Sequence, residues 1–229
     1  MSTEIRSLGG RDVPVSVRRS DRARRIGLTI DPMGGVELVV PRRVAMADAE
    51  RFLESEAEWV LARLAAMPPR VPFAHGAVIP VLGRDKRIVH LPLFPPEARD
   101  EGGELVVGGP EEGIAATVTA WLTALARDVL GGEARAKAAT LDLPVAGVTV
   151  RDQRTRWGSC SVRGRLSLSW RLVLAPPDVR DYVVSHEVAH LKEMNHGPNF
   201  WALVEWLCPG HARPRRWLRD NAKSLQRYG

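Results

Sequence analysis

The sequence predicts an α+β fold, in which a β-rich N-terminal region of residues 1–110 precedes a mainly helical domain of residues 111–229. Two observations support this prediction. Apolar and polar residues alternate in short segments near the N-terminus, as they do in half-buried strands. After residue 113, apolar residues recur at the three- and four-residue spacing of amphipathic helices. The 229-residue length allows one large domain or a domain with a smaller accessory region.

The N-terminal region is typical of strands followed by a helix. Residues 26–30 and 36–40 flank the turn signal DPMGG and predict a β-hairpin, and residues 13–17 predict a further strand. An apolar stripe among Glu and Arg predicts an amphipathic helix over residues 46–66, which a Pro-Pro pair ends.

A second hairpin is predicted at residues 77–93, around the turn Gly83-Arg84-Asp85. The following segment, 95–113, is rich in Pro, Gly and Glu and indicates a loop or the boundary between the two regions. The sequence shows no internal repeat.

The second half contains longer helical patterns. Apolar spacing predicts a helix from Ile114 to about Leu141, with an interruption at the Gly131-Gly132 pair. The remaining patterns predict, in chain order, strands at 145–150 and 165–170, a helix from about 178 to 192, and a helix between 197 and 209.

The composition is that of a globular protein with an excess of arginine. The formal net charge is +6, which can attract nucleic acid or acidic substrates, or merely spread over a solvated surface. Two cysteines, Cys160 and Cys208, imply no disulfide framework and fit a reducing compartment. We find neither a secretory signal nor an apolar run long enough for a membrane span, so we expect a cytoplasmic protein without a membrane partner.

The predicted helix near residue 186 carries the pattern HExxH. His186 and His190 are four residues apart, so they share one helical face and can bind one metal ion. Glu187 lies beside that face, where it can reach a water molecule rather than the ion. The helix is apolar nearly all round, which indicates burial, and two buried histidines with a glutamate need a compensating partner. A cation supplies one, which points to a metal-dependent hydrolase.

Catalytic zinc usually takes three protein ligands and leaves one position open. His196 is the best third ligand, because the chain can turn back beneath the metal after the helix. Three alternatives stay open. Glu205 on the following helix is the strongest, since other zinc peptidases use a glutamate from a later helix; Glu193 and His211 are weaker.

A second segment, RTRWGSCS, precedes the alternating strand at 165–170. If this strand lies at a sheet edge beside the metal, it can hold an extended peptide by strand addition. Arg156 is a candidate to polarise the substrate or to stabilise an oxyanion. Packing and turn formation explain Trp157, Gly158 and Trp170 individually at least as well. Cys160 fits the role of a small buried residue better than that of a fourth ligand.

The runs RWGSCS and LSLSWRLVLAPPDVRDYVVSHEVAHLKEMNHGPNFW resemble the YgjP-like metallopeptidase family, which is related to the SprT-like and WLM peptidases of the zincin type. The N-terminal hairpin, the helix around Trp59 and the VLGR segment are similar to that family's N-terminal part, so the resemblance covers nearly the whole chain. The ligand spacing also matches the metzincins, but Glu193 stands where those enzymes carry glycine, and no later Met-turn is visible.

The resemblance implies a zincin-like catalytic domain over residues 111–229, with Zn²⁺ held by His186, His190 and His196 and with Glu187 as the catalytic residue. It implies a protein or peptide substrate. Related SprT-like and WLM peptidases act on proteins associated with DNA, so DNA or a DNA-associated protein is a further partner by analogy.

Two other functions remain open from the sequence. The same site could hydrolyse a nucleotide phosphoanhydride, with Arg154 and Arg156 binding the anionic substrate. Alternatively, the chain could be a non-enzymatic nucleic-acid-binding module with a structural metal. Glu187 and the open fourth position of the site argue against a purely structural metal.

Overall fold

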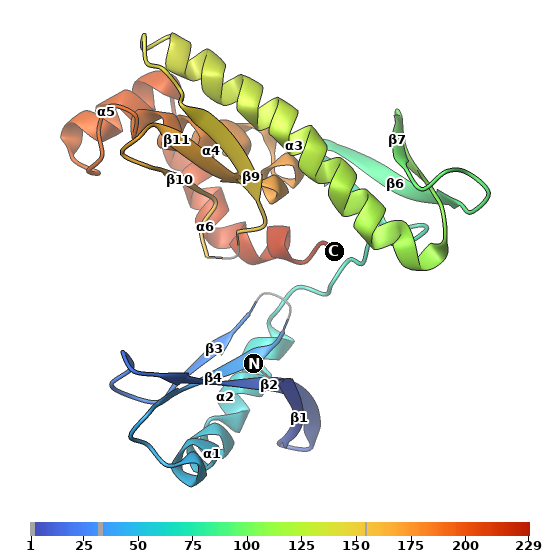
Figure 1. The fold of residues 1–229 in the computed structure, drawn as a ribbon, viewed down its shortest axis with the longest axis vertical. Coiled ribbons are helices and arrows are strands. Elements are labelled where there is room, and N and C mark those ends of the chain that lie inside the picture. Colours follow the sequence, from blue (N-terminus) through green and yellow to red (C-terminus); the bar gives the residue numbers. More distant parts are fainter. Residues whose placement is uncertain (1–2, 32–33, 154) are drawn as a thin grey trace. The chain divides into compact units, whose positions relative to one another are not determined.

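The computed structural model describes residues 3–31, 34–153 and 155–229 (Figure 1). The predicted turn residues Pro32 and Met33 and the candidate Arg154 lie outside these ranges. The chain divides into two compact units, Met1–Pro69 and Arg70–Gly229, each with its own hydrophobic core. We describe each unit by itself.

The first unit is a four-stranded sheet followed by two helices. Its strands pair in the order β1-β2-β4-β3, and the predicted hairpin is confirmed as the antiparallel pair β3–β4. A first strand that the sequence did not indicate pairs with β2. The elements are β1 (Thr3–Leu8), β2 (Arg11–Ser20), β3 (Gly27–Ile30), β4 (Val36–Pro41), α1 (Met46–Ser55) and α2 (Ala57–Ala65).

The alternation of buried and less buried side chains along the strands explains the core of this unit. Val36, Leu38 and Val40 point to one face of β4 and are buried together with Leu53 and Val60 of the two helices. The single helix predicted over residues 46–66 is divided between α1 and α2.

The second unit begins with another four-stranded sheet, in the order β5-β6-β8-β7. The predicted hairpin at 77–93 is confirmed as β5–β6, whereas the segment 95–113, predicted as a loop, contains the hairpin β7–β8. These strands are β5 (Val78–Val81), β6 (Arg84–Leu91), β7 (Ala98–Glu101) and β8 (Glu104–Gly108).

This sheet repeats the topology of the first unit. In both sheets, the outer strand pairs are antiparallel and the central pair, β2–β4 or β6–β8, is parallel. The last strand of each follows a Gly-Gly turn and contains the same run, Glu37-Leu-Val-Val and Glu104-Leu-Val-Val. Strand order and turn position recur although few side chains do, so this repeat lies in the topology and not in a visible sequence repeat.

The rest of the second unit surrounds a long helix, α3, which runs without a break through Gly131 and Gly132. The predicted boundary at 110/111 differs from the observed division, because the strands before it share one core with α3 and the elements after it. The remaining elements are η1 (Glu111–Gly113), α3 (Ile114–Ala139), β9 (Gly147–Arg151), β10 (Gly158–Cys160), β11 (Arg165–Ser169), η2 (Trp170–Leu174), α4 (Pro177–Ala189), α5 (Pro198–Leu207) and α6 (Ala212–Gln226).

The segment Glu111–Ala139 is long and apolar enough, by length and composition, to cross a membrane, contrary to the expectation from the sequence that no such run exists. Within the fold it has the pattern of a core helix. Its buried residues recur mostly every fourth position, from Ile114 and Val118 to Ala134 and Ala138, and this stripe belongs to the core of the second unit.

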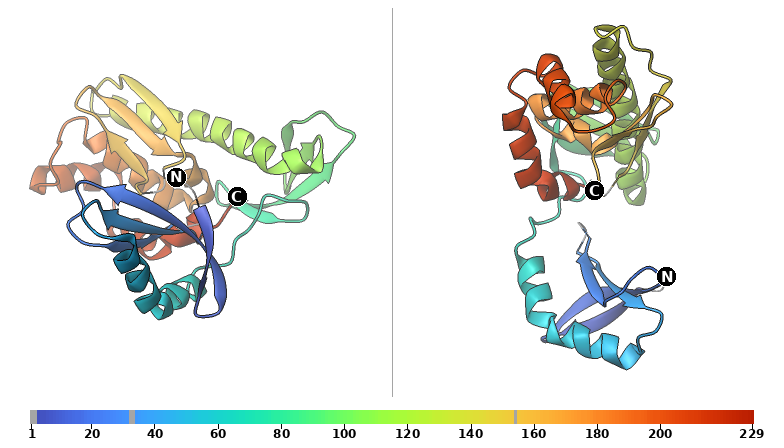
Figure 2. Two further views of the ribbon diagram at one scale, coloured as in Figure 1. Left: turned by 60° about the horizontal axis from the view of Figure 1, so that its bottom comes forward. Right: turned by 90° about the vertical axis from the view of Figure 1, so that its left-hand side faces the viewer.

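A small sheet in the order β10-β11-β9 positions the site, with α4 beside it (Figures 1 and 2). Strands β9 and β11 are parallel, and β10 pairs antiparallel with β11 and forms the edge. Leu166 and Leu168 of β11 face the core, so Arg165 and Ser167 face the opposite side.

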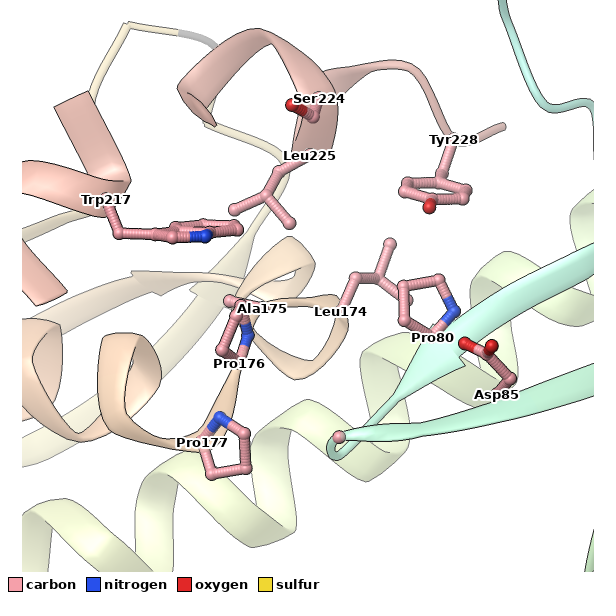
Figure 3. A pocket seen from close by; sticks show the side chains of 11 residues that line it. Pro80, Asp85, Leu174, Ala175, Pro176, Pro177, Trp217, Ser224, Leu225 and Tyr228 are labelled. Carbon is pink, nitrogen blue, oxygen red and sulfur yellow. The ribbon is translucent and has the colours of Figure 1, made fainter. Parts of the chain in front are cut away.

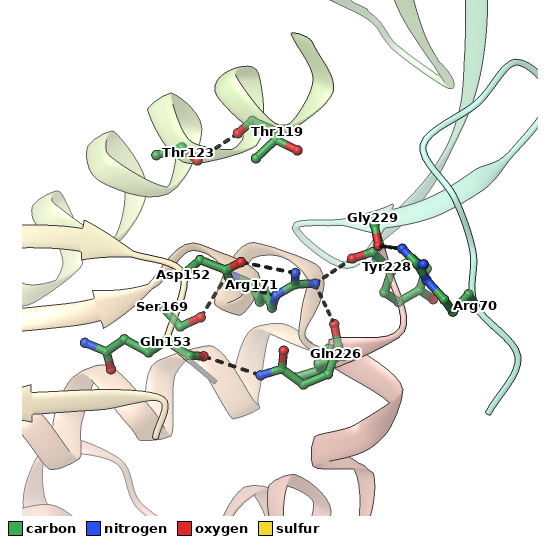
Figure 4. Close-up of polar contacts among 11 residues, drawn as sticks. Arg70, Thr119, Thr123, Asp152, Gln153, Ser169, Arg171, Gln226, Tyr228 and Gly229 are labelled. Carbon is green, nitrogen blue, oxygen red and sulfur yellow. Dashed lines mark hydrogen bonds and ion pairs between the residues drawn. The ribbon is translucent and has the colours of Figure 1, made fainter. Parts of the chain in front are cut away.

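A buried arginine fixes the loop that leads into β10 (Figure 4). Arg171 Nε donates to Asp152 Oδ1 at 2.9 Å, and the same guanidinium donates to the carbonyl oxygen of Tyr228 at 2.6 Å. Gln226 Nε2 donates to the carbonyl oxygen of Gln153 at 3.4 Å. The C-terminal end of the chain therefore holds the start of the loop that carries Arg156.

Candidate metal centre

Helix α4 presents the HExxH residues. It begins at Pro177, a favoured first helical residue, and it is buried along most of its length, as the sequence predicted. Two ion pairs join it to α3: Arg180 with Glu133 at 2.9 Å and Asp181 with Lys137 at 2.8 Å. These contacts and its apolar faces hold the helix rigidly beneath β10.

Three imidazoles converge at the end of this helix. His186 lies on α4, His190 caps the C-terminal end of α4, and His196 lies in the turn before α5. One nitrogen atom of each ring can be chosen so that all three lie within 4.8 Å of one another, and the Nε2 atoms of His186 and His196 are 3.2 Å apart. The turn thus carries His196 back to the helix, as the spacing suggested.

The nitrogen atoms fit a metal ion. Ligands at about 2.0–2.1 Å from a tetrahedral zinc ion lie about 3.3 Å from one another, close to the His186–His196 separation. His190 Nδ1 is 2.9 Å from the carbonyl oxygen of Glu193, which can only accept, so this nitrogen carries the proton and Nε2 keeps a free lone pair. His186 Nδ1 is buried without a hydrogen-bond partner among the described residues.

Burial keeps two of the imidazoles neutral. It lowers the pKa of His186 to about 4, with smaller contributions from His190 and His196. It also lowers the pKa of His190, although the hydrogen bond that His190 donates to the Glu193 carbonyl opposes this. Neutral imidazole is the form that binds a metal, so these two rings are ready to bind at neutral pH.

Phe200 of α5 forms the apolar floor of the three rings. It is fully buried, and its ring centroid lies 4.9 Å from that of His186, 4.5 Å from that of His190 and 4.7 Å from that of His196. A rigid aromatic beneath all three ligands limits their motion and excludes water from one side of the centre.

Glu187 lies next to the triad in a cavity of about 230 Å³ that Arg156, Trp157, Gly158 and Tyr182 also line. Its side chain is only 6% exposed. Burial raises the pKa of Glu187 to about 7, and the positive charge of Arg156 opposes that rise. A carboxyl group with a pKa near neutrality is suited to accepting and returning a proton.

Gly158 of β10 makes room for this carboxyl. A Cβ atom at this position would lie 2.5 Å from both Cγ and Oε1 of Glu187, closer than any real contact. Only glycine lets the edge strand approach Glu187 so closely.

The alternative ligands are engaged elsewhere. Both carboxylate oxygens of Glu205 are bonded, one by the backbone N–H of Gly210 at 3.1 Å and one by His211 Nδ1 at 2.7 Å. The His211 ring stacks on Tyr182 at 6.2 Å. Burial raises the pKa of the Cys160 thiol to about 11, so Cys160 stays protonated. Among the described residues, the ligand cluster comprises His186, His190 and His196 alone.

From the sequence, Tyr182 and Phe200 were missed as site residues, and Gly158 was considered only for packing and turn formation. Tyr182 precedes His186 by one helical turn, so the i, i+4 spacing could have indicated it. Gly158 and Phe200 carry no local signal, because their roles depend on which residue lies across the gap.

A further cavity of about 350 Å³ shares no lining residue with the metal centre (Figure 3). Trp217 and Leu225 face Pro80, Pro176 and neighbouring apolar groups across it. Among its described lining residues, Asp85 is the only acidic or basic one.

The α+β fold and this site define a metallopeptidase domain, since residues 24–221 match the family described as "YgjP-like, metallopeptidase domain". That match spans most of the chain. The chain therefore belongs to the YgjP-like metallopeptidase family, and the resemblance seen in the sequence is confirmed. Membership implies a divalent metal, for which the three histidines are the candidate ligands.

Among solved structures, the chain is similar to the crystal structure of the metallopeptidase zymogen of Pyrococcus abyssi abylysin. The two share 25% sequence identity over 47% of this chain and 94% of that chain, with a TM-score of 0.32. No curated protein matches the chain.

Proposed function

We propose that this metallopeptidase is zinc-dependent, with His186, His190 and His196 as metal ligands and Glu187 as general base. The observation that carries the proposal is the buried Glu187 carboxyl beside three converging imidazoles. The free cysteines Cys160 and Cys208 support a cytoplasmic location, which is part of the proposal.

Zinc, when bound by the three imidazoles, would lower the pKa of a water molecule and polarise the scissile carbonyl. Glu187 accepts the proton of the attacking water on its carboxylate and then returns that proton to the leaving amine. Arg156 and Tyr182 line the same cavity and carry hydrogen-bond donors, so they can stabilise the negative charge that develops on the carbonyl oxygen.

The edge strand β10 supports a peptide substrate. The backbone bonds flanking β10 join Ser161 N to Arg165 O and Trp157 O to Ser169 N, both toward β11. By alternation along an antiparallel pair, the N–H and C=O groups of Gly158 and Cys160 point to the free edge. An extended peptide can pair with these groups, which places its backbone beside Glu187.

The test compares the metal-loaded wild type with Glu187→Gln in an unbiased peptide and protein hydrolysis screen. Glutamine keeps the shape of the side chain but cannot accept the proton, so turnover falls by about 10²–10⁴-fold or more. Zinc content and thermal unfolding of the loaded proteins stay close to those of the wild type. Activity within about tenfold of wild type with zinc retained contradicts the role of Glu187, because general-base catalysis contributes more than that.

A further inference from the structure

A polar cavity of the second unit lies on the face of the β10-β11-β9 sheet that is turned away from the core. Its volume is about 670 Å³. Residues from all three strands and from the loop before β10 line it: Thr149, Arg151, Gln153, Thr155, Arg156, Ser159, Cys160, Ser161, Arg165, Leu166 and Ser167.

The lining is positively charged. Its described lining residues include the guanidinium groups of Arg151, Arg156 and Arg165 and no carboxylate. None of the three forms an ion pair with any residue that the structure describes. The buried arginines Arg171 and Arg180, by contrast, are paired with Asp152 and Glu133.

Hydroxyl groups fill the space between the charges. Ser159, Ser167 and Thr149 occupy matching positions on the three adjacent strands, so they form one row across the sheet. Arg165 and Arg151 lie on opposite sides of this row: Arg165 is two residues before Ser167 on β11, and Arg151 is two residues after Thr149 on β9. Guanidinium and hydroxyl donors in one concave surface suit an oxyanion.

This cavity adjoins the metal centre. Arg156 lines both cavities, and β10 forms a wall of each. On β10, Gly158 faces Glu187 whereas Ser159 faces the arginine-lined cavity. A peptide paired with the free edge of β10 alternates in the same way, so residues next to the one at Glu187 direct their side chains toward the arginines.

We propose that this cavity is a substrate subsite that binds acidic side chains of the peptide, with Arg151 and Arg165 as specificity-determining residues. The proposal rests on the proposed peptidase function. It adds the substrate class: peptides with Asp or Glu close to the scissile bond.

The experiment measures binding, so that it does not depend on hydrolysis. Fluorescein-labelled peptides that differ only in carrying Glu, Gln or Lys at alternate positions are titrated with full-length, zinc-loaded Glu187→Gln protein. The affinity for the Glu peptide exceeds that for the Gln peptide by about tenfold or more, which is the ratio expected of one charge-assisted hydrogen bond. The Lys peptide binds most weakly. Adding Arg151→Gln and Arg165→Gln brings the Glu-to-Gln ratio close to one.

Arg127→Gln is the matched control, since Arg127 is an exposed arginine of α3 that does not line the cavity. It changes the net charge in the same direction and leaves the Glu-to-Gln binding ratio intact.

Equal binding of the Glu and Gln peptides, or a preference for the Glu peptide that survives the double substitution, overturns the subsite. If a nucleoside triphosphate binds only when both arginines are present, and the Glu peptide is not preferred, the cavity binds phosphate. This result also overturns the proposed peptide subsite. A peptide that binds as proposed but is not cut by the wild type leaves the subsite standing and removes the peptidase function.

Discussion

Glu187 and His186 are adjacent on α4, and burial acts on them in opposite directions. It raises the pKa of the carboxyl group to about 7 and lowers that of the imidazole to about 4. Between these values both groups are held neutral in the metal-free protein. A bound cation reverses this preference for Glu187, since positive charge favours the carboxylate.

The ligand assignment predicts a difference between two substitutions. His196→Ala removes one of the three converging nitrogens, and zinc affinity falls by more than about 100-fold, because changes outside the ligand set alone cost up to about that much. Glu205→Ala leaves the content at about one zinc per chain, because the Glu205 carboxylate bonds Gly210 and His211 instead. Metal analysis of the two purified variants measures the zinc content of each. Zinc loss in Glu205→Ala with zinc retained in His196→Ala would give the ligand role to Glu205.

The raised pKa of Glu187 predicts a pH-dependent gain from Glu187→Gln in metal-free protein. As pH rises from 4.5 to about 7, Glu187 loses its proton in the unfolded chain but keeps it in the folded chain. The wild type therefore loses stability over this pH range. Glutamine has no such loss. The advantage of the variant in free energy of unfolding therefore grows by about 3 kcal/mol between pH 4.5 and pH 7.

Urea unfolding of both metal-free proteins at several pH values measures this difference. The lowered pKa of His186 affects both proteins alike and cancels in the comparison. A constant difference across the window would show that the Glu187 carboxyl is not desolvated. Saturating zinc shrinks the advantage, because the cation stabilises the carboxylate.

At the scale of elements, the sequence predicts a segment well where its apolar residues follow one period. The HExxH helix, the β3–β4 hairpin and the helix after residue 197 are all found. Helix α6 was missed because few apolar residues, mainly Trp217, Leu218 and Leu225, lie among its many charged residues. The hairpin β7–β8 was missed because its strands are short and the surrounding Gly and Pro indicate a loop.

The site was predictable only in part for a related reason. His186, Glu187 and His190 are specified by spacing within one helix, which a sequence displays directly. The close approach of β10 to α4 is a tertiary contact. It is visible in the sequence only as a glycine, a residue type that is equally common in tight turns, in bulges and at helix ends.

That contact predicts the effect of Gly158→Ala. The added methyl group would overlap Glu187, so the carboxyl must move by about 1 Å or more, and turnover falls by about 100-fold. Zinc content is unchanged, because the atoms nearest to the added methyl group belong to Glu187 and not to an imidazole. Gly132→Ala is the control: no atom lies within 4 Å of that Cβ position, so this change in α3 leaves turnover intact and stabilises the helix by about 0.5–1 kcal/mol. Equal activity of the two variants would contradict the positioning role of Gly158.

At the scale of the molecule, the charge is distributed unevenly between the two units. Residues 1–69 carry 11 basic against 10 acidic residues, whereas residues 70–229 carry 22 against 17. Two arginines of the cluster at residues 18–25 already make contacts within the first unit. Arg18 pairs with Glu37 at 2.8 Å, and Arg19 donates to backbone carbonyls. The net positive charge that the sequence suggested for nucleic acid thus belongs mainly to the second unit.

If DNA is a partner, this distribution predicts that a fragment of residues 70–229, which has its own core, retains most of the affinity of the full chain. Binding should be electrostatic: affinity for a short duplex falls by roughly 100-fold between about 50 and 200 mM salt for about four phosphate contacts. Fluorescence anisotropy of labelled DNA with both proteins measures the salt slope. Loss of binding in the fragment would place the interaction on the first unit, and no retention by the full chain even at low salt would remove DNA as a partner. A salt-independent affinity would contradict the electrostatic origin, since counterion release requires the slope.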